Sequence, residues 1–355
     1  MLIARGLAGR GLSCGIYVLS PVREAGRYEA LLASCRAAGV VVYAPASNWG
    51  GASVVSRLAW TALTGRRRIV LWTWGYRAEA LRLAIPMLGL ARGIFSIRSA
   101  SESQLWRWRW LLRFGRAFTW RYVSNSQLGI ELADKVAPGI ALKAQVVLNA
   151  MEPEFFSAMN PTTCRPTILR VAMLGNARFL IKGYDLALDV AQAIGVAGFP
   201  IRIHIGGAQP PGEPILTEQI KRRGLEEMVI WEGPVSDPAE FLRAGHVFML
   251  LSRYEGMPNA LFEAMALGLP CIATAVGDLP RLAEESCGLR VVPIEDSAAA
   301  FSELRYLWEN WDTACRMGAR AREFCRSRLS EATMLRSVAQ VLELAHDAAN
   351  GPPET

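Results

Sequence analysis

Residues 252–263, with the sequence SRYEGMPNALFE, decide the fold, and they continue as AMALGLPCIATAVGDLPRLAEE to residue 285. The apolar run VFMLL at 247–251 precedes them and is typical of a buried strand in a parallel sheet. A loop with Gly, Pro and Asn then leads into a predicted helix. Ligands of open α/β sheets bind at the carboxyl ends of strands, where a loop and a helix N-terminus present N–H groups. The sequence therefore predicts a ligand site in this loop.

The loop consists of Glu255, Gly256, Met257, Pro258, Asn259 and Ala260. Gly256 allows the backbone to approach a ligand closely, and Pro258 fixes the turn. Glu263 follows Glu255 by eight positions and lies about one turn inside the predicted helix. Carboxylates accept hydrogen bonds from vicinal sugar hydroxyls, so the two Glu are candidate sugar ligands. The alternative is a strand–helix unit with two solvated Glu.

This stretch, with Glu255 and Glu263 separated by seven residues inside EGMPNALFEAMALGLPCIAT and followed by VGDLP, resembles the signature of the family 4 retaining glycosyltransferases, the glycosyl transferases of group 1. The resemblance is sharpest over residues 168–285. It implies the GT-B fold, which is two Rossmann-like, doubly wound α/β domains facing a cleft. It also implies transfer of a sugar from a nucleotide sugar, UDP-linked rather than GDP-linked, to a glycan or lipid-linked acceptor in polysaccharide, lipopolysaccharide or glycolipid biosynthesis. Retention of configuration, with no metal or other cofactor, is implied as well.

The length of 355 residues exceeds one hydrophobic core and favours two domains. Strands and helices alternate along the chain, which is typical of parallel doubly wound sheets. By the resemblance, residues 1–150 form the acceptor-side domain, 151–166 a linker, and 167–327 the nucleotide-sugar-binding domain. A helix at 328–349 would pack back on the first domain. Family members begin with a further strand and Gly-rich loop, so we expect the first domain to lack its first strand.

The predicted strand at 168–174 runs into a second candidate loop. Family members place basic groups on the donor diphosphate here, which assigns that role first to Lys182 and then to Arg178. An ammonium beside two phosphates would offset the charge that grows on the leaving nucleotide. The alternative for Lys182 is a solvated loop lysine. The resemblance assigns the ribose hydroxyls to Glu263 and the donor-sugar hydroxyls to Glu255. The implied donor-binding set is Gly175, Asn176, Arg178, Lys182, Val235, Glu255, Gly256, Met257, Pro258, Asn259, Ala260 and Glu263.

Arg98 follows the predicted strand at 93–97, where many family members carry a His that contacts the transferred sugar. No His occurs in residues 1–150. A guanidinium matches phosphate geometry, so Arg98 could contact the departing diphosphate or an acceptor phosphate. An ordinary Arg at the edge of the cleft is the alternative. With Lys182 and Glu255, Arg98 completes the candidate catalytic set.

Residues 103–122, SQLWRWRWLLRFGRAFTWRY, combine aromatic and basic side chains at helical spacing. Trp106, Trp110, Phe114 and Phe118 would share one side of a helix. The net charge is +7, from 39 Lys and Arg against 32 Asp and Glu, and acids are few in the first half. The range Arg107–Arg121 is therefore a candidate contact for an anionic membrane surface. Alternatively the aromatic stripe is core and the arginines are only solvated. Nucleic acid is not an expected partner, since no known nucleic-acid-binding module surrounds this segment.

Other chemistries leave no pattern in the sequence. It contains no D-x-D, H-x-H, H-E-x-x-H, G-x-G-x-x-G or P-loop pattern, so no metal site is predicted. The seven Cys are scattered without C-x-x-C and are typical of a reducing compartment. A cytoplasmic protein, or one peripheral to the cytoplasmic face of the inner membrane, is expected. Two alternatives stay open: a non-catalytic protein that binds nucleotide sugars or a membrane surface, and a nucleotide-sugar epimerase, which the G-x-P-N-x-x-x-E-A pattern favours less.

Overall fold

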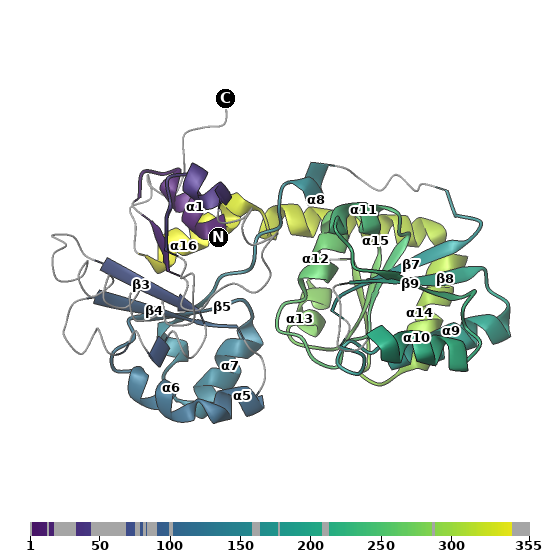
Figure 1. Ribbon diagram of the computed structural model, residues 1–355, viewed down its shortest axis with the longest axis horizontal. Coiled ribbons are helices and arrows are strands. Elements are labelled where there is room, and N and C mark those ends of the chain that lie inside the picture. The colour runs from purple at the N-terminus through teal and green to yellow at the C-terminus, as the bar shows by residue number, and fades with distance from the viewer. Residues whose placement is uncertain are drawn as a thin grey trace. The chain divides into compact units, whose positions relative to one another are not determined.

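The computed structural model describes residues 2–12, 14–17, 33–43, 69–74, 79–80, 83, 91–98, 102–157, 164–176, 178–207, 213–285 and 288–342. The chain divides into two units, Met1–Ala150 with Glu331–Thr355, and Met151–Ser330 (Figure 1). Each unit is built on parallel strands with helices packed against them, which confirms the predicted fold class of two Rossmann-like α/β domains. The cleft between the domains and the missing first strand stay predictions.

Unit 1 contains a four-stranded parallel sheet in the order β3-β4-β5-β6. The strands are β3 (Ile69–Trp74), β4 (Ala91–Ile97), β5 (Arg121–Ser124) and β6 (Ala144–Val146). A separate parallel pair joins β1 (Gly15–Tyr17) to β2 (Val41–Tyr43). Strands β1 to β4 overlap apolar stretches of the sequence, whereas β5 and β6 are short and mixed in composition. The sequence also favours helices at 28–38 and 77–89. Residues 33–37 of the first are described and helical, and most of the second lies outside the described residues.

The sheet of unit 1 is covered on two faces, because successive residues of a strand point to opposite sides. Ile94 packs with α1 (Leu2–Ala8) and α16 (Glu331–Val341). Phe95 packs with α5 (Glu102–Arg107), α6 (Arg109–Gly115) and α7 (Gln127–Val136) on the other face (Figure 1). A Cβ at Gly6 would lie 2.5 Å from the Leu335 side chain, so α1 and α16 approach closely.

Three expectations for helices and connections need correction. Residues 103–122 do not form one helix, because the backbone of Trp108 leaves the helical range (φ −106°, ψ 16°) between α5 and α6. The helix expected at 328–349 begins only at residue 331, after α15 (Trp311–Arg328) has ended. The expected linker carries α8 (Glu154–Ser157) and belongs to unit 2, since Met151 and Phe155 are buried there.

Unit 2 is a six-stranded parallel sheet in the order β12-β11-β10-β7-β8-β9. The strands are β7 (Leu169–Leu174), β8 (Ile201–Gly206), β9 (Val229–Gly233), β10 (Val247–Leu250), β11 (Cys271–Thr274) and β12 (Leu289–Val292). The chain starts at β7, builds outward through β8 and β9, and then returns to place β10 on the other side of β7. The switch point of the sheet, where ligands of such folds bind, therefore lies between β7 and β10.

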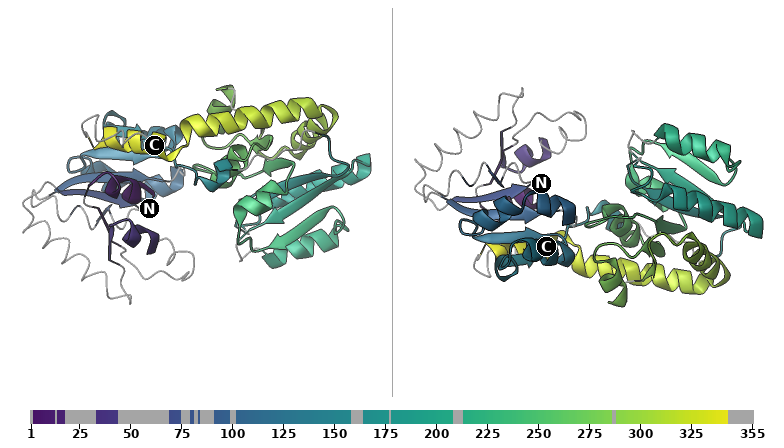
Figure 2. Two further views of the ribbon diagram at one scale, coloured as in Figure 1. Left: turned by 90° about the horizontal axis from the view of Figure 1, so that it is seen from above. Right: turned by 90° about the horizontal axis from the view of Figure 1, so that it is seen from below.

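The helices of unit 2 lie on both sides of its sheet (Figure 2). They are α9 (Tyr184–Ala197), α10 (Glu213–Arg222), α11 (Pro238–Arg243), α12 (Asn259–Ala266), α13 (Leu279–Glu284), α14 (Ser297–Glu309) and α15. Helices α9 and α14 share a core with buried residues of β7 and β8. Two helices begin at aspartate N-caps, where Asp237 and Asp296 accept from backbone N–H groups of the first turn. This packed frame fixes the loops at the switch point.

Candidate functional site

Two loops meet at the switch point of unit 2, and a glycine marks their contact. Residues 175–183 follow β7, and residues 251–258 follow β10, its neighbour in the sheet. Gly183 has φ +66°, and a Cβ there would lie 2.0 Å from the carbonyl oxygen of Leu251. Because only glycine fits this backbone contact, the two loops are held together at one point. The sequence pattern Lys-Gly-Tyr-Asp at 182–185 thus has a steric reason.

A third loop joins them at the same edge of the sheet. Gly207 follows β8, and a Cβ on it would lie 1.6 Å from the carbonyl oxygen of Gly175. Gly175 in turn donates its N–H to the carbonyl of Gly206 at 3.0 Å. The loops that follow β7, β8 and β10 therefore contact one another through backbone atoms, at glycines that have no side chain to cover the main chain. Such a surface allows a ligand to approach the main chain closely.

Lys182 and Glu255, two of the three candidate catalytic residues, form an ion pair at the junction of these loops. The distance from Lys182 Nζ to Glu255 Oε1 is 2.6 Å, and the hydroxyl of Ser252 donates to the same oxygen at 2.8 Å. The two side chains are 18% and 14% exposed. Lys182 is therefore not the solvated loop lysine of the alternative interpretation. An anionic ligand could replace Glu255 as the partner of this ammonium and leave the carboxylate for hydroxyl groups.

Tyr184 lies beneath this pair and was not predicted as a site residue. It is 2% exposed, and its hydroxyl donates to the backbone carbonyl of Asn176 at 3.3 Å. Burial raises the pKa of Tyr184, and the negative charge of Glu255 raises it further. The phenol therefore stays protonated and keeps its proton for the Asn176 carbonyl. This contact fixes the course of the loop after β7.

The loop after β10 ends where α12 begins, as the sequence predicts. Pro258 occupies the N-cap position with extended backbone (φ −77°, ψ 94°), and the helix starts at Asn259. Glu263 lies in the second turn of α12 and is partly buried. Glu255 begins the loop, so the two carboxylates lie at opposite ends of the segment 255–263. Gly277, after β11, would bring a Cβ within 3.0 Å of the carbonyl oxygens of Glu255 and Gly256. The loop after β11 therefore packs directly against the backbone of Glu255 and Gly256.

The remaining predicted donor-binding residues lie at the same sheet edge. Arg178 is exposed on the loop after β7, and Val235 follows β9. The side chain of Val235 would lie 2.6 Å from a Cβ on Gly206. Met257 and Ala260 are partly buried and Asn259 is exposed on the segment that leads into α12. Every predicted donor-binding residue is thus on a loop, or in the first two turns of a helix, at the carboxyl edge of this one sheet.

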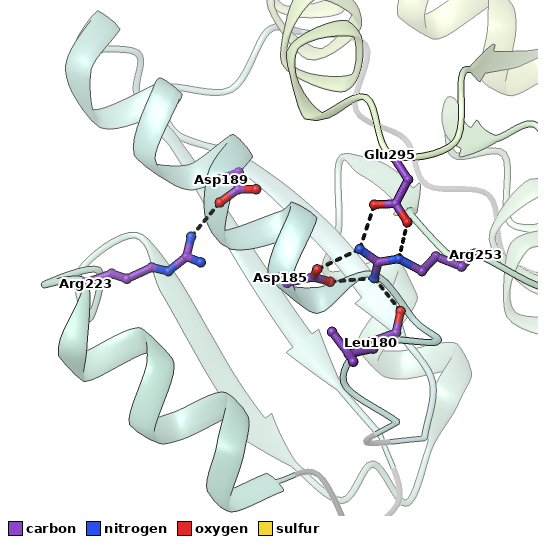
Figure 3. A network of polar contacts seen from close by, with 6 residues as sticks. All are labelled: Leu180, Asp185, Asp189, Arg223, Arg253 and Glu295. Carbon is purple, nitrogen blue, oxygen red and sulfur yellow. Dashed lines mark hydrogen bonds and ion pairs between the residues drawn. The ribbon is translucent and has the colours of Figure 1, made fainter.

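Arg253 joins three loops of the site and was missed by the sequence interpretation (Figure 3). Its guanidinium pairs with Asp185 on α9 through two hydrogen bonds of 2.8 and 2.7 Å. It also pairs with Glu295, after β12, and donates to the carbonyl of Leu180. All five N–H groups of the guanidinium have acceptors. These partners raise the pKa of Arg253 above its usual value. Glu295 has φ +66°, which is uncommon for a residue other than glycine.

Arg98, the third candidate catalytic residue, belongs to unit 1. It follows β4 and donates from Nη1 to Asn149 Oδ1 at 2.6 Å, so it bridges the ends of the first and third of three neighbouring strands. Desolvation lowers its pKa, but a guanidinium stays charged near neutral pH. Asn125 follows the strand between them, and its Oδ1 is buried without a hydrogen-bond partner. Polar side chains therefore gather at the carboxyl edge of this sheet too.

Neither a metal-binding cluster nor a membrane-crossing helix occurs in the described part of the chain. No three His, Cys, Asp or Glu side chains there gather in a way that could hold a metal ion. Among the same residues, no helix is long and apolar enough to cross a membrane.

Comparisons with known proteins match part of the chain by sequence and nearly all of it by fold. Residues 165–310 match the family model described as glycosyl transferases group 1. N-acetyl-alpha-D-glucosaminyl L-malate synthase of Bacillus anthracis is 30% identical over 137 residues, which are 38% of this chain and 36% of that protein. A putative colanic acid biosynthesis glycosyltransferase, WcaL of Salmonella typhimurium, is 29% identical over 171 residues, 46% of this chain and 42% of that protein. The matched regions thus span less than half of each relative.

Solved structures resemble the chain along nearly its whole length. Anabaena HepE in complex with UDP and glucose superposes with a TM-score of 0.78 at 16% identity, covering 96% of this chain and 95% of HepE. Sucrose-phosphate synthase of Thermosynechococcus elongatus gives 0.72 at 15% identity, with 96% and 91% covered. These likenesses confirm the GT-B fold that the sequence predicted.

Proposed function

We propose that this chain, whose residues 165–310 match the family model of the glycosyl transferases of group 1, transfers a sugar from a nucleotide-sugar donor to a glycan or lipid-linked acceptor. The observation that carries the proposal is the ion pair of Lys182 with Glu255 at the switch point of a parallel sheet. Glycines around the pair leave the backbone accessible to a ligand. This arrangement offers a cation to a diphosphate and a carboxylate to sugar hydroxyls within one small volume.

The proposed donor is a UDP-sugar rather than a GDP-sugar. HepE, which shares the fold, was solved with UDP and with UDP-glucose. The diphosphate would take Lys182 from Glu255, with Arg178 as a second cation. The carboxylate of Glu255 would then accept hydrogen bonds from the donor sugar, and Glu263 from the ribose. Backbone near Val235 would meet the base.

The proposed chemistry proceeds with retention of configuration and without a metal. The bond between the anomeric carbon and the diphosphate oxygen breaks, and the acceptor oxygen bonds to the same face of that carbon. The acceptor proton passes to the departing phosphate. The protein supplies charge stabilisation and positioning, through Lys182, Arg178 and loop N–H groups on the leaving diphosphate. Arg98 would contact the departing diphosphate or an acceptor phosphate from unit 1.

The proposed role is in surface polysaccharide or lipopolysaccharide synthesis. This setting is supported by relatives such as WcaL and the lipopolysaccharide core mannosyltransferase LpsB of Rhizobium meliloti, which is 32% identical over 140 residues. A cytoplasmic location is proposed, at the membrane face when the acceptor is lipid-linked. Six described cysteines are free thiols, three of them buried, which fits a reducing compartment.

The test is a panel of UDP-, GDP- and ADP-sugars, with binding measured by thermal shift and turnover by release of free nucleotide. Glu263→Ala should abolish the thermal shift, because the ribose loses its acceptor. Glu226→Ala is the matched control, since Glu226 is exposed just before the amino end of β9, at the far edge of the same sheet. Donor binding unchanged in Glu263→Ala would contradict the assigned role. Binding without nucleotide release, with acceptors supplied, would favour a non-catalytic binding protein, and conversion of the donor into an epimeric nucleotide sugar would favour the epimerase.

A further inference from the structure

The aromatic side chains of α5, α6 and the turn after them lie on the surface of unit 1. We call Trp106, Trp110, Phe114 and Phe118 the aromatic face; they are 46%, 55%, 69% and 47% exposed. The alternative interpretation, in which this stripe forms core, is therefore wrong. Leu105 and Leu112 fill the core instead, at 0% and 2% exposure. The two helices thus bury leucines and present the larger aromatic rings outward, which is the reverse of an ordinary surface helix.

The aromatic face is continuous and interleaved with arginine. The rings of Trp110 and Phe114 stack with centroids 5.8 Å apart. The guanidinium of Arg109 lies 5.9 Å from the Trp106 ring and 5.4 Å from the Trp110 ring, so it joins the two. Arg113 lies 5.8 Å from the Trp110 ring on the same surface. The guanidinium groups of Arg109 and Arg113 therefore lie close enough to the rings to contact the same ligand or surface.

The charge of this region has one sign. Residues 102–121 contain five arginines and a single acid, Glu102, and they hold four of the eleven tryptophans of the chain. An open hollow of about 400 Å³ lies beside the aromatic face. Its lining is apolar except for one guanidinium: Leu83, Arg107, Trp108, Trp110, Leu111, Phe114 and Gly115. A partner must therefore combine negative charge with apolar groups a few ångströms away.

We propose that the aromatic face docks unit 1 on an anionic lipid bilayer. Tryptophan favours the depth of the lipid headgroups, where its ring is apolar and its N–H stays hydrated. Arginines at that depth pair with lipid phosphates, which their planar forks fit. In water the same arginines cover the rings through cation–π contacts. The hollow gives room to the first methylenes of a lipid below its phosphate. Lipid binding of this kind does not depend on the proposed sugar transfer.

The test is co-sedimentation of the full chain with vesicles, without any nucleotide sugar. Neutral phosphatidylcholine vesicles are compared with vesicles that also contain phosphatidylglycerol. We expect binding to the anionic vesicles that weakens with salt, since exposed charges are screened. Arg107→Gln with Arg109→Gln should weaken it about 25-fold, because each arginine near the surface contributes about fivefold. Trp110→Ala with Phe114→Ala should weaken it at least tenfold.

A matched control exists in unit 2. Arg290 lies 4.8 Å from the ring of Tyr306, which is 38% exposed, and this pair belongs to no proposed site. Arg290→Gln with Tyr306→Ala removes an arginine and an aromatic ring without touching the aromatic face, and it should bind vesicles as the original chain does. Thermal melts show whether each variant is folded. If Trp110→Ala with Phe114→Ala proves unfolded, Trp106→Ala takes its place, with an expected loss of about threefold.

Three outcomes would overturn the proposal. Equal binding to neutral and anionic vesicles would remove the role of charge. Undiminished binding by folded variants of the aromatic face would place the contact elsewhere. Binding of a single-stranded oligonucleotide through these residues, with no binding to vesicles, would assign the surface to nucleic acid. Failure of sugar transfer in the donor panel would leave this proposal standing, because vesicle binding is measured without donor.

Discussion

Replacing Arg253 by Gln should destabilise unit 2 more than any other single change to an ion pair shown in Figure 3. The substitution keeps the side chain polar but shortens it by two bonds, and it removes the charge and most of the donors. Asp185 and Glu295 then lose the cation that they share, and the carbonyl of Leu180 loses a donor. The loops after β7, β10 and β12 would lose their common anchor.

The size of the effect follows from exposure. Arg253 and Asp185 are 25% and 23% exposed, so their two charge-assisted hydrogen bonds should contribute about 1.5–2 kcal/mol in total after solvent screening. Glu295 is 55% exposed, and its contact should add less than about 1 kcal/mol. The bond to the Leu180 carbonyl should add about 0.5–1 kcal/mol. The total of about 3 kcal/mol corresponds to a fall in Tm of about 6–12 °C for a unit of this size.

Thermal unfolding followed by circular dichroism measures this fall, and Arg223→Gln is the control. Arg223 makes a single contact of 2.6 Å to Asp189 on the same helix as Asp185, and the two side chains are 29% and 45% exposed. Its loss should cost less than about 1 kcal/mol. We also expect Arg253→Gln to raise the KM for the donor about tenfold with a smaller change in kcat, because loop positions, not reacting groups, are lost. The reasoning would be refuted if Arg253→Gln melted within 2 °C or so of Arg223→Gln.

Three further predictions rest on single side chains. Gly183→Ala should destabilise unit 2 by more than about 3 kcal/mol in denaturant unfolding, because its Cβ cannot fit 2.0 Å from the carbonyl oxygen of Leu251 at φ +66°; a loss below 1 kcal/mol or so would contradict the loop contact. Tyr184 should not ionise at its ordinary pKa near 10, since burial and then Glu255 raise its pKa, so an ultraviolet titration of folded Tyr184→Phe should match that of the original chain up to about pH 11. Burial lowers the pKa values of His204 and His246 below 6.5, so the unfolded chain binds more protons in the window just below that pH, and stability should be lost as pH falls through it. His204→Gln should flatten this slope, and an unfolding free energy independent of pH there would count against it.

The sequence predicted the elements of unit 2 that build the switch point. The apolar runs at 168–174 and 247–251 have the length and composition of buried parallel strands, and both are strands, β7 and β10. The glycine-containing loops after them are fixed by local chemistry, since a backbone contact such as that of Gly183 admits no other residue. Apolar runs and loop glycines act on the backbone nearby, so strands and turns can be predicted from them without knowledge of distant contacts.

Contacts between distant residues could not be predicted in the same way. Arg253 is 68 positions from Asp185 and 42 from Glu295, and the three meet only because β7, β10, β11 and β12 lie side by side in the sheet. The aromatic face was ambiguous for a different reason. Aromatic residues four positions apart mark one side of a helix, but the spacing does not say whether that side faces core or solvent. The aromatic face is exposed because Leu105 and Leu112 occupy the core positions of α5 and α6.

The pairing of α1 with α16 has a consequence for synthesis on the ribosome. The polypeptide that forms unit 2 emerges after most of unit 1 and before α16, so unit 2 can fold while its companion is incomplete. Until the last helix arrives, Ile3, Leu7 and Ile94 have only part of the cluster that buries them. Nascent unit 1 should therefore recruit chaperones for longer than unit 2, and a chain arrested after residue 330 should release a folded unit 2 beside an unfinished, aggregation-prone unit 1.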